Sequence, residues 1–352
     1  MALEDRARDL AAEVQPLDEA AAERARERHM VLAKPPESLG RLEEMGWRLS
    51  GMAGRVPPPV PADPAVVVCA GDHGVLARGV SPWPNEVTAV MVRNFCGGGA
   101  SVNAIARTVG VRVSVLDVGV AAEPERHPLL RAAKVRPGTD DLSRRPAMSR
   151  EDAARAVMSG AGIAEELIES GVDLLVTGDM GIGNTTPAAA LISAITGRPP
   201  EEVTGRGTGI DDEALELKVR VVEEVLRLHE PDPTDPLGAL AALGGLEHAA
   251  IVGLVLMGAV YGVPVILDGV VSNSAALVAH TLSPDCVGYI IAGHLSTEPG
   301  AAVALKHLGL EPVLDLRMRL GEGTGGLLAV PIVRAAARVL GEMATMEEMG
   351  IG

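Results

Sequence analysis

Aromatic residues are nearly missing from this chain of 352 residues, which contains one Phe, two Tyr and two Trp. A surface of stacked aromatic rings for reading nucleic-acid bases is therefore excluded. The formal net charge of −16 would also repel a polyanion, and no basic cluster on a helix face offsets it. We therefore expect no nucleic-acid partner.

Cysteine and lysine are scarce as well. The three cysteines, Cys69, Cys96 and Cys286, lie far apart and form no CxxC pair, which favours reduced thiols over a disulfide framework or a zinc site. None of the four lysines follows a glycine, so the chain has no phosphate loop for a nucleoside triphosphate. The segment Gly205–Gly209 is rich in glycine but lacks the GxGxxG spacing of a dinucleotide site.

An apolar signal segment is missing from residues 1–30, which are dense in Glu, Asp and Arg. We therefore expect a cytoplasmic protein. The uncharged run Ala249–Leu267 is nearly long enough to cross a bilayer, but glycines and Pro264 interrupt it. We interpret it as a buried helix that ends near Tyr261 and a strand over Val263–Leu267, and we expect no membrane partner.

Short β-branched runs alternate with longer helical patterns along the chain. Because these runs are almost wholly apolar, we expect a sheet that is buried on both faces. The sequence therefore predicts an α/β fold with a doubly wound, mainly parallel six-stranded sheet of the Rossmann-like type. The expected strands are Ala65–Cys69, Val111–Leu116, Val172–Val176, Val263–Leu267, Val287–Ile291 and Pro312–Leu316.

Two helical patterns are especially clear. The first covers Ser149–Ser170, with Ser149 as its N-cap and acidic residues in its first turn. The second covers Asp211–His229 and predicts an apolar stripe on one helix face. That stripe consists of Leu215, Val219, Val222 and Leu226.

The first sixty residues follow a different pattern. Helices are expected over Leu17–Leu32 and Arg41–Met52, and the proline-rich segment Pro57–Pro61 precedes the first strand. We therefore expect a small helical domain over residues 1–60, joined by the C-terminal helices at about residues 325–352. Residues 61–324 would form the large α/β catalytic domain.

Two glycine-rich turns, Gly178–Thr186 and Arg319–Gly326, each follow a strand-like run and precede a helix-like one. Ligands of α/β sheets bind at such turns. The first turn offers backbone N–H groups and two hydroxyls at a helix N-terminus, which favours a phosphate, although a plain turn capped by a threonine is the simpler alternative. The second turn presents one carboxylate, Glu322, which is either a functional acid or a cap for the helix that begins near Gly325.

Two histidines stand close to acids in the sequence. His73 follows Asp72, and His294 precedes Glu298 by four residues. No further residues at the spacing of metal ligands lie nearby, so we expect structural or substrate-orienting roles and no metal site.

Eight ordered sequence blocks give the chain a specific resemblance that runs from about residue 30 to the C-terminus. Together they resemble the nicotinate-nucleotide:dimethylbenzimidazole phosphoribosyltransferase family of cobalamin biosynthesis. The blocks are Lys34–Gly40, Ala70–Val75, Glu86–Thr88, Gly178–Thr186, Gly205–Asp212, Leu267–Gly269, Leu320–Gly325 and Glu342–Thr345.

This resemblance implies transfer of the 5-phosphoribosyl group from nicotinate mononucleotide to 5,6-dimethylbenzimidazole, which yields α-ribazole 5′-phosphate and nicotinate. The leaving ring is cationic in the donor and neutral after departure, so no metal or cofactor is expected. The attacking benzimidazole must lose a proton, and the resemblance gives the role of general base to Glu322. It also implies a homodimer whose active site includes residues from both subunits.

The remaining site residues form two expected groups. The phosphate group consists of Gly181, Ile182, Gly183, Asn184, Thr185, Thr186, Lys218 and Arg206. The base pocket consists of Ser81, Met91, Asp179, Met180 and Leu320.

Three positions depart from the family pattern. The family usually has Glu where Asp179 stands, often Gln near Val90, and often Gly in place of Glu37. The first two departures leave the acceptor open between dimethylbenzimidazole, a related benzimidazole, a purine and a phenol.

Two other functions are compatible with the same residues. One is a phosphoribosyltransferase that uses a pyrophosphate donor, since Val265–Asn273 superficially resembles its signature; such an enzyme normally needs magnesium and adjacent acids, and this segment has only Asp268. The other is a non-catalytic nucleotide sensor, against which the retained Glu322 argues.

Overall fold

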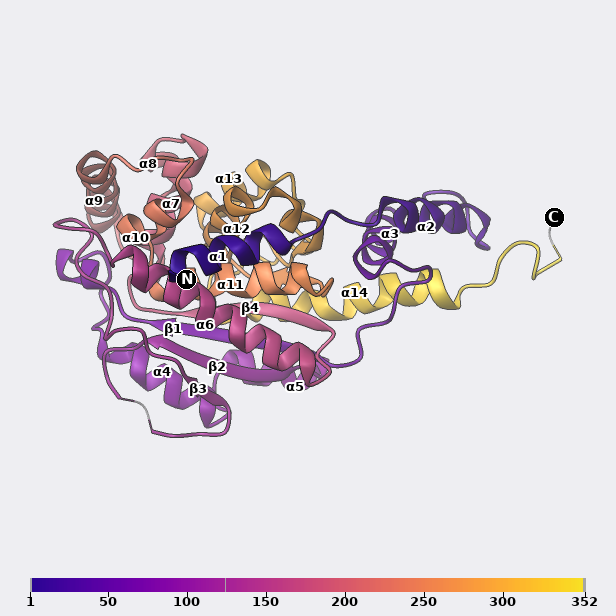
Figure 1. Ribbon diagram of the computed structural model, residues 1–352, viewed down its shortest axis with the longest axis horizontal. Helices are drawn as coiled ribbons and strands as arrows, with labels where there is room; N and C mark the ends of the chain where they lie inside the picture. Colours follow the sequence, from indigo (N-terminus) through magenta and orange to yellow (C-terminus); the bar gives the residue numbers. More distant parts are fainter. Residues whose placement is uncertain (1, 124, 351–352) are drawn as a thin grey trace.

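The computed structural model describes residues 2–123 and 125–350 and has an α/β fold (Figure 1). Six strands form one wholly parallel sheet in the order β3-β2-β1-β4-β5-β6. This order reverses direction between β1 and β4, as in a doubly wound sheet, so the predicted fold class is confirmed. The strands are β1 (Pro64–Gly71), β2 (Arg112–Gly119), β3 (Leu130–Ala132), β4 (Leu174–Met180), β5 (Val265–Leu267) and β6 (Ile290–Ala292).

Helices cover both faces of the sheet. On one face α6 and α11 pack against β1, β2 and β4, and on the other face α4, α5 and α14 contact the same sheet. Both faces of the sheet are therefore shielded from water, which explains why every residue of β1 is buried. The α-helices are α1 (Leu3–Glu13), α2 (Glu19–Val31), α3 (Arg41–Ala53), α4 (Glu86–Cys96), α5 (Ser101–Val109), α6 (Arg150–Glu169), α7 (Thr185–Thr196), α8 (Pro200–Val203), α9 (Asp212–His229), α10 (Pro236–Leu243), α11 (Leu246–Val260), α12 (Val270–Leu282), α13 (Pro299–Leu308) and α14 (Thr324–Glu342), and two 3₁₀ helices cover Gly74–Arg78 and Pro284–Tyr289.

The strand predictions were correct for the centre of the sheet and wrong at its edges. Segment Pro312–Leu316 is not a strand: it runs beside β6 and forms one isolated bridge, between Leu314 and His294. The sixth strand is instead β3, a three-residue edge strand that is largely exposed. Residues Val287–Tyr289 belong to a 3₁₀ helix, so β6 starts later than predicted.

Helix α6 begins as predicted, because the Ser149 hydroxyl accepts the backbone N–H of Asp152. In α9 the predicted apolar stripe lies to one side of the face that is buried in the structure. Val222 is buried as expected, but its buried neighbours are Lys218, Val221 and Val225. The lysine lies on the inner face because it reaches the cavity described below.

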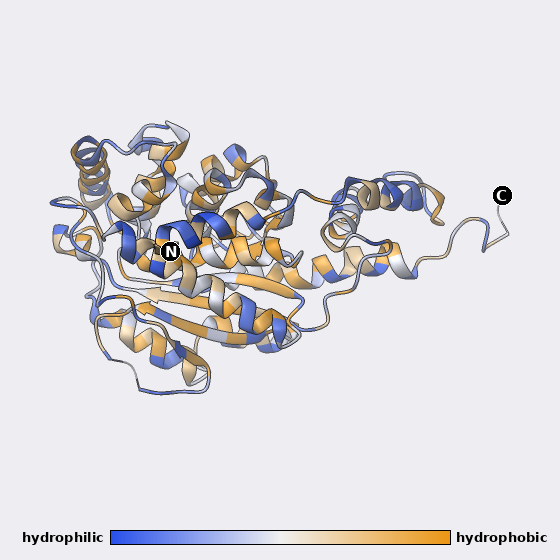
Figure 2. Ribbon diagram, in the orientation of Figure 1, coloured by the Kyte–Doolittle hydropathy of each residue, from blue (hydrophilic) through white to orange (hydrophobic). Residues whose placement is uncertain are grey.

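The uncharged run Ala249–Leu267 is core, as predicted. It forms most of α11, which ends at Val260, and then β5. Figure 2 shows the apolar residues concentrated in the strands and in α11. Helix α14 is also long and apolar enough to cross a membrane by length and composition alone, and it packs against α3, α5, β4 and β5.

A helical lobe projects from the sheet, at the end of the molecule that holds the C-terminus (Figure 1). Helices α2, α3 and α14 pack together there, and Ala25, Leu32 and Leu340 form a small hydrophobic cluster separate from the main core. The C-terminal segment joins this lobe, since Met346 N–H donates to Val31 O at 2.9 Å. Helix α1 packs instead on α6 and α11, so we propose that the helical domain starts after α1 rather than at residue 1.

Candidate active site

A cavity of about 380 Å³ opens at the carboxyl ends of the strands. Its walls include Asp179 at the end of β4, Gly269 after β5 and His294 after β6. This edge, beside the reversal of strand order between β1 and β4, is where doubly wound sheets bind ligands. The two glycine-rich turns therefore meet in one cavity.

Most of the predicted site residues line this cavity. They are Ser81, Met91, Asp179, Met180, Gly181, Ile182, Gly183, Asn184, Thr185, Lys218, Leu320 and Glu322. Thr186 and Arg206 are not among the lining residues. The Thr186 side chain is fully buried, and Arg206 turns outward to form an ion pair with Asp212.

The Gly181–Thr185 turn connects β4 to α7, and close packing fixes its backbone. A Cβ atom on Gly181 would lie 2.4 Å from Gly71 O, so only glycine fits there. Gly183 has a φ of +90°, which a side chain would disfavour. The N–H of Ile182 donates to Thr88 Oγ1 at 3.2 Å, so this predicted phosphate donor is already used within the protein.

Two cations line the cavity beside this turn. The ammonium of Lys218 donates to Thr185 Oγ1 at 2.7 Å and to Gly205 O at 2.9 Å, and only 1% of the residue is exposed. Burial lowers the pKa of Lys218 to about 8, although the carboxylate of Glu298 opposes the change. Arg319 also lines the cavity and donates to Gly207 O. These cations could hold a dianion that the acidic chain would otherwise repel.

Glu322 has a left-handed backbone, with a φ of +64°, between Gly321 and Gly323, whose φ values are also positive. A non-glycine residue in this region is strained and is often functional. Only 6% of the residue is exposed, and Oε2 accepts the N–H of Val102 at 3.4 Å. Glu322 therefore does not cap α14, whose N-cap is Gly323.

Asp268 anchors the loop that carries Glu322. Its carboxylate accepts the backbone N–H groups of Gly323, Gly325 and Gly326 at 2.8–3.1 Å. A Cβ on Gly325 would lie 1.9 Å from the ring of His294, so the loop is packed too closely for any side chain at that position. The carboxylate of Asp268 thus holds the loop in place.

Two acids in the cavity hold their protons more tightly than usual. Burial raises the pKa of Glu322, and the charge of Asp268 adds to this effect, while the Val102 N–H opposes it. Burial and then the charge of Asp268 raise the pKa of Asp179 to about 8, against the hydrogen bond that Asn184 Nδ2 donates at 2.9 Å. Near neutral pH, Asp179 is therefore largely protonated.

Part of the cavity lining is apolar and includes Val80, Val87, Met91, Met180 and Leu320, with the hydroxyl of Ser81 as a polar group. Trp83 also lines the cavity and is 53% exposed. The near absence of aromatics in the sequence therefore did not exclude an aromatic side chain at the ligand site. Val90 is half-exposed on α4 and is not among the lining residues.

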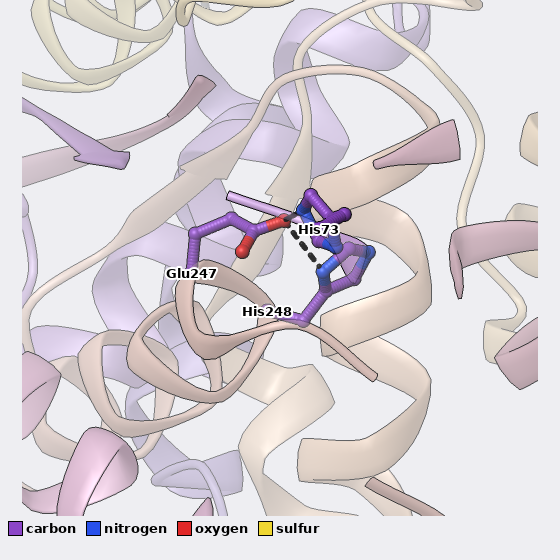
Figure 3. A group of neighbouring side chains, drawn as sticks. All are labelled: His73, Glu247 and His248. Carbon is purple, nitrogen blue, oxygen red and sulfur yellow. Dashed lines mark hydrogen bonds and ion pairs between the residues drawn. The ribbon is translucent and has the colours of Figure 1, made fainter. Parts of the chain in front are cut away.

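A buried cluster of His73, Glu247 and His248 lies beside the Gly181–Thr185 turn, since a Cβ on Gly181 would lie 2.9 Å from His73 Nε2. Figure 3 shows the three side chains. Glu247 Oε1 is 2.7 Å from His73 Nε2 and 2.9 Å from His248 Nδ1, and all three side chains are fully buried. Burial alone would raise the pKa of Glu247, but the two imidazoles outweigh it and hold the pKa at about 2. These three residues converge as metal ligands could.

The comparisons with known proteins agree with this geometry. Residues 14–351 match a family model described as phosphoribosyltransferase. The chain is 53% identical to the nicotinate-nucleotide–dimethylbenzimidazole phosphoribosyltransferase of Salinispora tropica, with 97% of each chain covered. It has a TM-score of 0.91 and 48% identity to the crystal structure of the protein of that name from Thermus thermophilus, covering 96% of this chain and 99% of that one. The chain belongs to this family.

Membership of the phosphoribosyltransferase family confirms the resemblance found in the sequence blocks. Glu37, one of the three positions noted in the sequence, has a φ of +59°, in the left-handed region that favours glycine. Several cavity residues were missed as site residues, among them Val80, Trp83, Val87, Thr208, Ser296 and Arg319. Arg319 had the strongest signal, since it begins the second glycine-rich turn.

Proposed function

We propose that this phosphoribosyltransferase moves 5-phosphoribose from nicotinate mononucleotide to 5,6-dimethylbenzimidazole, within cobalamin lower-ligand synthesis. One observation carries the proposal: a single cavity is lined by a glycine-rich turn with Lys218, by a set of apolar side chains, and by Glu322. The turn and Lys218 suit the donor phosphate, and the apolar side chains suit a flat apolar acceptor. Glu322 can accept the proton that the acceptor must lose.

The reaction needs few groups from the protein. A ring nitrogen of the acceptor attacks the anomeric carbon, and the bond from this carbon to the pyridinium nitrogen breaks with its electron pair. Nicotinate then leaves with a neutral ring nitrogen. The second acceptor nitrogen transfers its proton to Glu322, whose carboxylate stands in a largely buried position where its raised pKa makes it a better base than an exposed acid.

At the other end, the proposed phosphate contacts are the backbone of Gly181 and Gly183, the side chains of Asn184 and Thr185, and the Lys218 ammonium. Arg319 joins this proposed set in place of Arg206. Binding a dianion there would restore the full charge of Lys218, whose pKa burial lowers. This arrangement lets binding energy at the phosphate position the ribose for attack.

The alternative with a pyrophosphate donor finds less support. That chemistry needs carboxylates free to hold magnesium, whereas both oxygens of Asp268 accept backbone N–H groups of the Glu322 loop. A non-catalytic sensor would not require a strained acid at the centre of the cavity. Both alternatives are tested by the assay that follows.

The test incubates the purified protein with nicotinate mononucleotide and 5,6-dimethylbenzimidazole, with and without magnesium, and follows nicotinate and α-ribazole 5′-phosphate by chromatography. Parallel reactions contain benzimidazole, adenine or a phenol as acceptor, or phosphoribosyl pyrophosphate in place of nicotinate mononucleotide as donor. Product without magnesium supports the proposal. Product formed only with another acceptor would mean that the enzyme uses that acceptor in place of dimethylbenzimidazole. Turnover that requires the pyrophosphate donor and magnesium, or donor binding without turnover, would overturn it.

We also propose that the protein is a cytoplasmic homodimer with residues of both subunits near each cavity. Trp83 and Leu320 line the cavity and are each more than half exposed, so a second subunit could cover them. Light scattering coupled to size-exclusion chromatography tests the assembly, with twice the chain mass of 36.3 kDa as the expected result.

A further inference from the structure

The imidazole of His73 lies directly against the turn proposed to bind phosphate. A Cβ atom on Gly181 would lie 2.9 Å from His73 Nε2, and one on Gly245 would lie 2.4 Å from His73 Cε1. Glycine at both positions lets the ring touch two backbones that are distant in sequence. The ring therefore sets the spacing between the turn after β4 and the start of α11.

Glu247 holds this ring in place. It lies in the first turn of α11, and its Oε1 is 2.7 Å from His73 Nε2 (Figure 3). Another glycine makes room for this carboxylate, because a Cβ on Gly71 would lie 2.9 Å from Oε2. A fully buried carboxylate is stable only beside groups that compensate its charge, so the pair links the segment that follows β1 to α11.

His248 shares the same carboxylate but does not share the contact with the turn. Its Nδ1 is 2.9 Å from Glu247 Oε1, and its ring meets that of His73 edge-on, with centroids 6.1 Å apart. The atoms nearest to a Cβ on Gly181 or Gly183 belong to Gly71, Leu76 and His73, and none belongs to His248. The two histidines thus differ in one respect that an experiment can use.

We propose that His73, oriented by Glu247, is a positioning residue for the Gly181–Thr185 turn. This inference rests on the proposed function, since it requires that the turn binds the donor phosphate. Hydrogen-bond donors to a substrate must be held to within about 0.5 Å, and small displacements at such groups cost up to about a hundredfold in rate. The buried pair supplies this support from beside the turn.

The experiment compares His73→Gln with His248→Gln, which remove the same kind of side chain from the same carboxylate. We measure kcat, the KM for nicotinate mononucleotide, the KM for dimethylbenzimidazole and the thermal unfolding midpoint. His73→Gln should raise the donor KM about tenfold and leave the acceptor KM within about twofold. His248→Gln should leave both KM values within about twofold, although both variants unfold at lower temperature.

A second variant, Glu247→Gln, keeps the test informative if His73→Gln does not fold. Glu247→Gln keeps the side-chain shape and should also raise the donor KM, because it loosens the His73 ring. Equal changes in donor KM for the two histidine variants would overturn the proposal in favour of a shared role such as a divalent cation held by all three side chains, which metal analysis of the purified protein would then detect. A fall in kcat and stability with an unchanged donor KM would also overturn it.

Calorimetric titration with nicotinate mononucleotide separates this inference from the proposed reaction. If the wild type binds the donor without turnover, the proposed function fails. In that case, a donor dissociation constant that rises in His73→Gln but not in His248→Gln still supports the positioning role. If the wild type does not bind the donor, both are overturned.

Discussion

The Glu322 carboxylate accepts the backbone N–H of Val102 at 3.4 Å, so it contacts the first turn of α5 rather than the helix that follows it in sequence. Val102 is far from Glu322 along the chain, and both residues are buried. The contact joins the loop that carries Glu322, which Asp268 anchors, to the start of α5. The carboxylate is therefore oriented without an ion pair that would lower its basicity.

Replacing Glu322 by Gln should remove the proton acceptor while keeping the side-chain volume. We expect kcat to fall at least about a hundredfold, with the donor KM nearly unchanged, because proton transfer is lost and phosphate binding is not. Steady-state kinetics with nicotinate release as the readout checks this, with thermal unfolding as the control for folding. A variant that keeps more than a tenth of the activity would show that another group takes the proton.

Asp179 should make stability depend on pH. Its pKa is raised from 3.8 to about 8 in the folded state, so between about pH 4 and pH 8 the folded protein keeps a proton that the unfolded chain loses. Stability therefore falls as the pH rises through this window. Asp179→Asn should remove this dependence, gaining more than about 1 kcal/mol over the wild type between pH 5 and pH 8.5 in urea unfolding. Parallel stability curves for the two proteins would contradict the prediction.

The centre of the fold could be predicted from sequence because its signals are local. Strand β1 is a continuous apolar run, β4 begins with one, and α6 begins at a serine N-cap followed by acidic residues in its first turn. The edge strand β3 gave no such signal, since three half-exposed residues bury too little to need an apolar pattern. Segment Pro312–Leu316 has the right composition, but it runs beside β6 and forms one isolated bridge instead of a strand.

The candidate site was predictable where glycines mark a turn and was missed where side chains meet only in the folded chain. His73 and Glu247 are separated by 174 positions, so no spacing could connect them. Lys218 was predicted as a phosphate contact, but the apolar stripe predicted for α9 did not show that it lies on the buried face of this helix, where it bonds to Thr185. Trp83 lies in a loop, where periodicity says nothing about which way a ring points.

The two cations expected at the phosphate should now differ in effect. Lys218 lines the cavity and contacts Thr185, whereas Arg206 pairs with Asp212 outside it. Lys218→Met should raise the donor KM by about ten- to a hundredfold, the range for losing a charged hydrogen bond. Arg206→Met, the matched control, should change it by no more than about twofold. Equal effects of the two variants on donor KM would mean that the loop carrying Arg206 rearranges when the donor binds.

The fluorescence of Trp83 should change when the acceptor binds. Its side chain lines the cavity, between Pro82 and Pro84, where a flat heterocycle can stack on the indole face. The other tryptophan, Trp47, is on α3, with the Arg26 guanidinium 3.9 Å from its ring centroid, so Trp47→Phe gives a protein with a single indole at the site. In that background, dimethylbenzimidazole should quench the fluorescence saturably.

The matching kinetic prediction is that Trp83→Ala raises the acceptor KM about tenfold and leaves the donor KM unchanged, because one stacking contact contributes about 1–1.5 kcal/mol. Trp83→Phe should recover most of the loss, since a phenyl ring keeps the stacking face but not the full area. If Trp83→Ala keeps the acceptor KM of the wild type and the single-indole protein shows no quenching, the exposed ring must serve a different surface. In that case the acceptor has to be recognised through the other apolar lining residues, Val80, Val87, Met91, Met180 and Leu320.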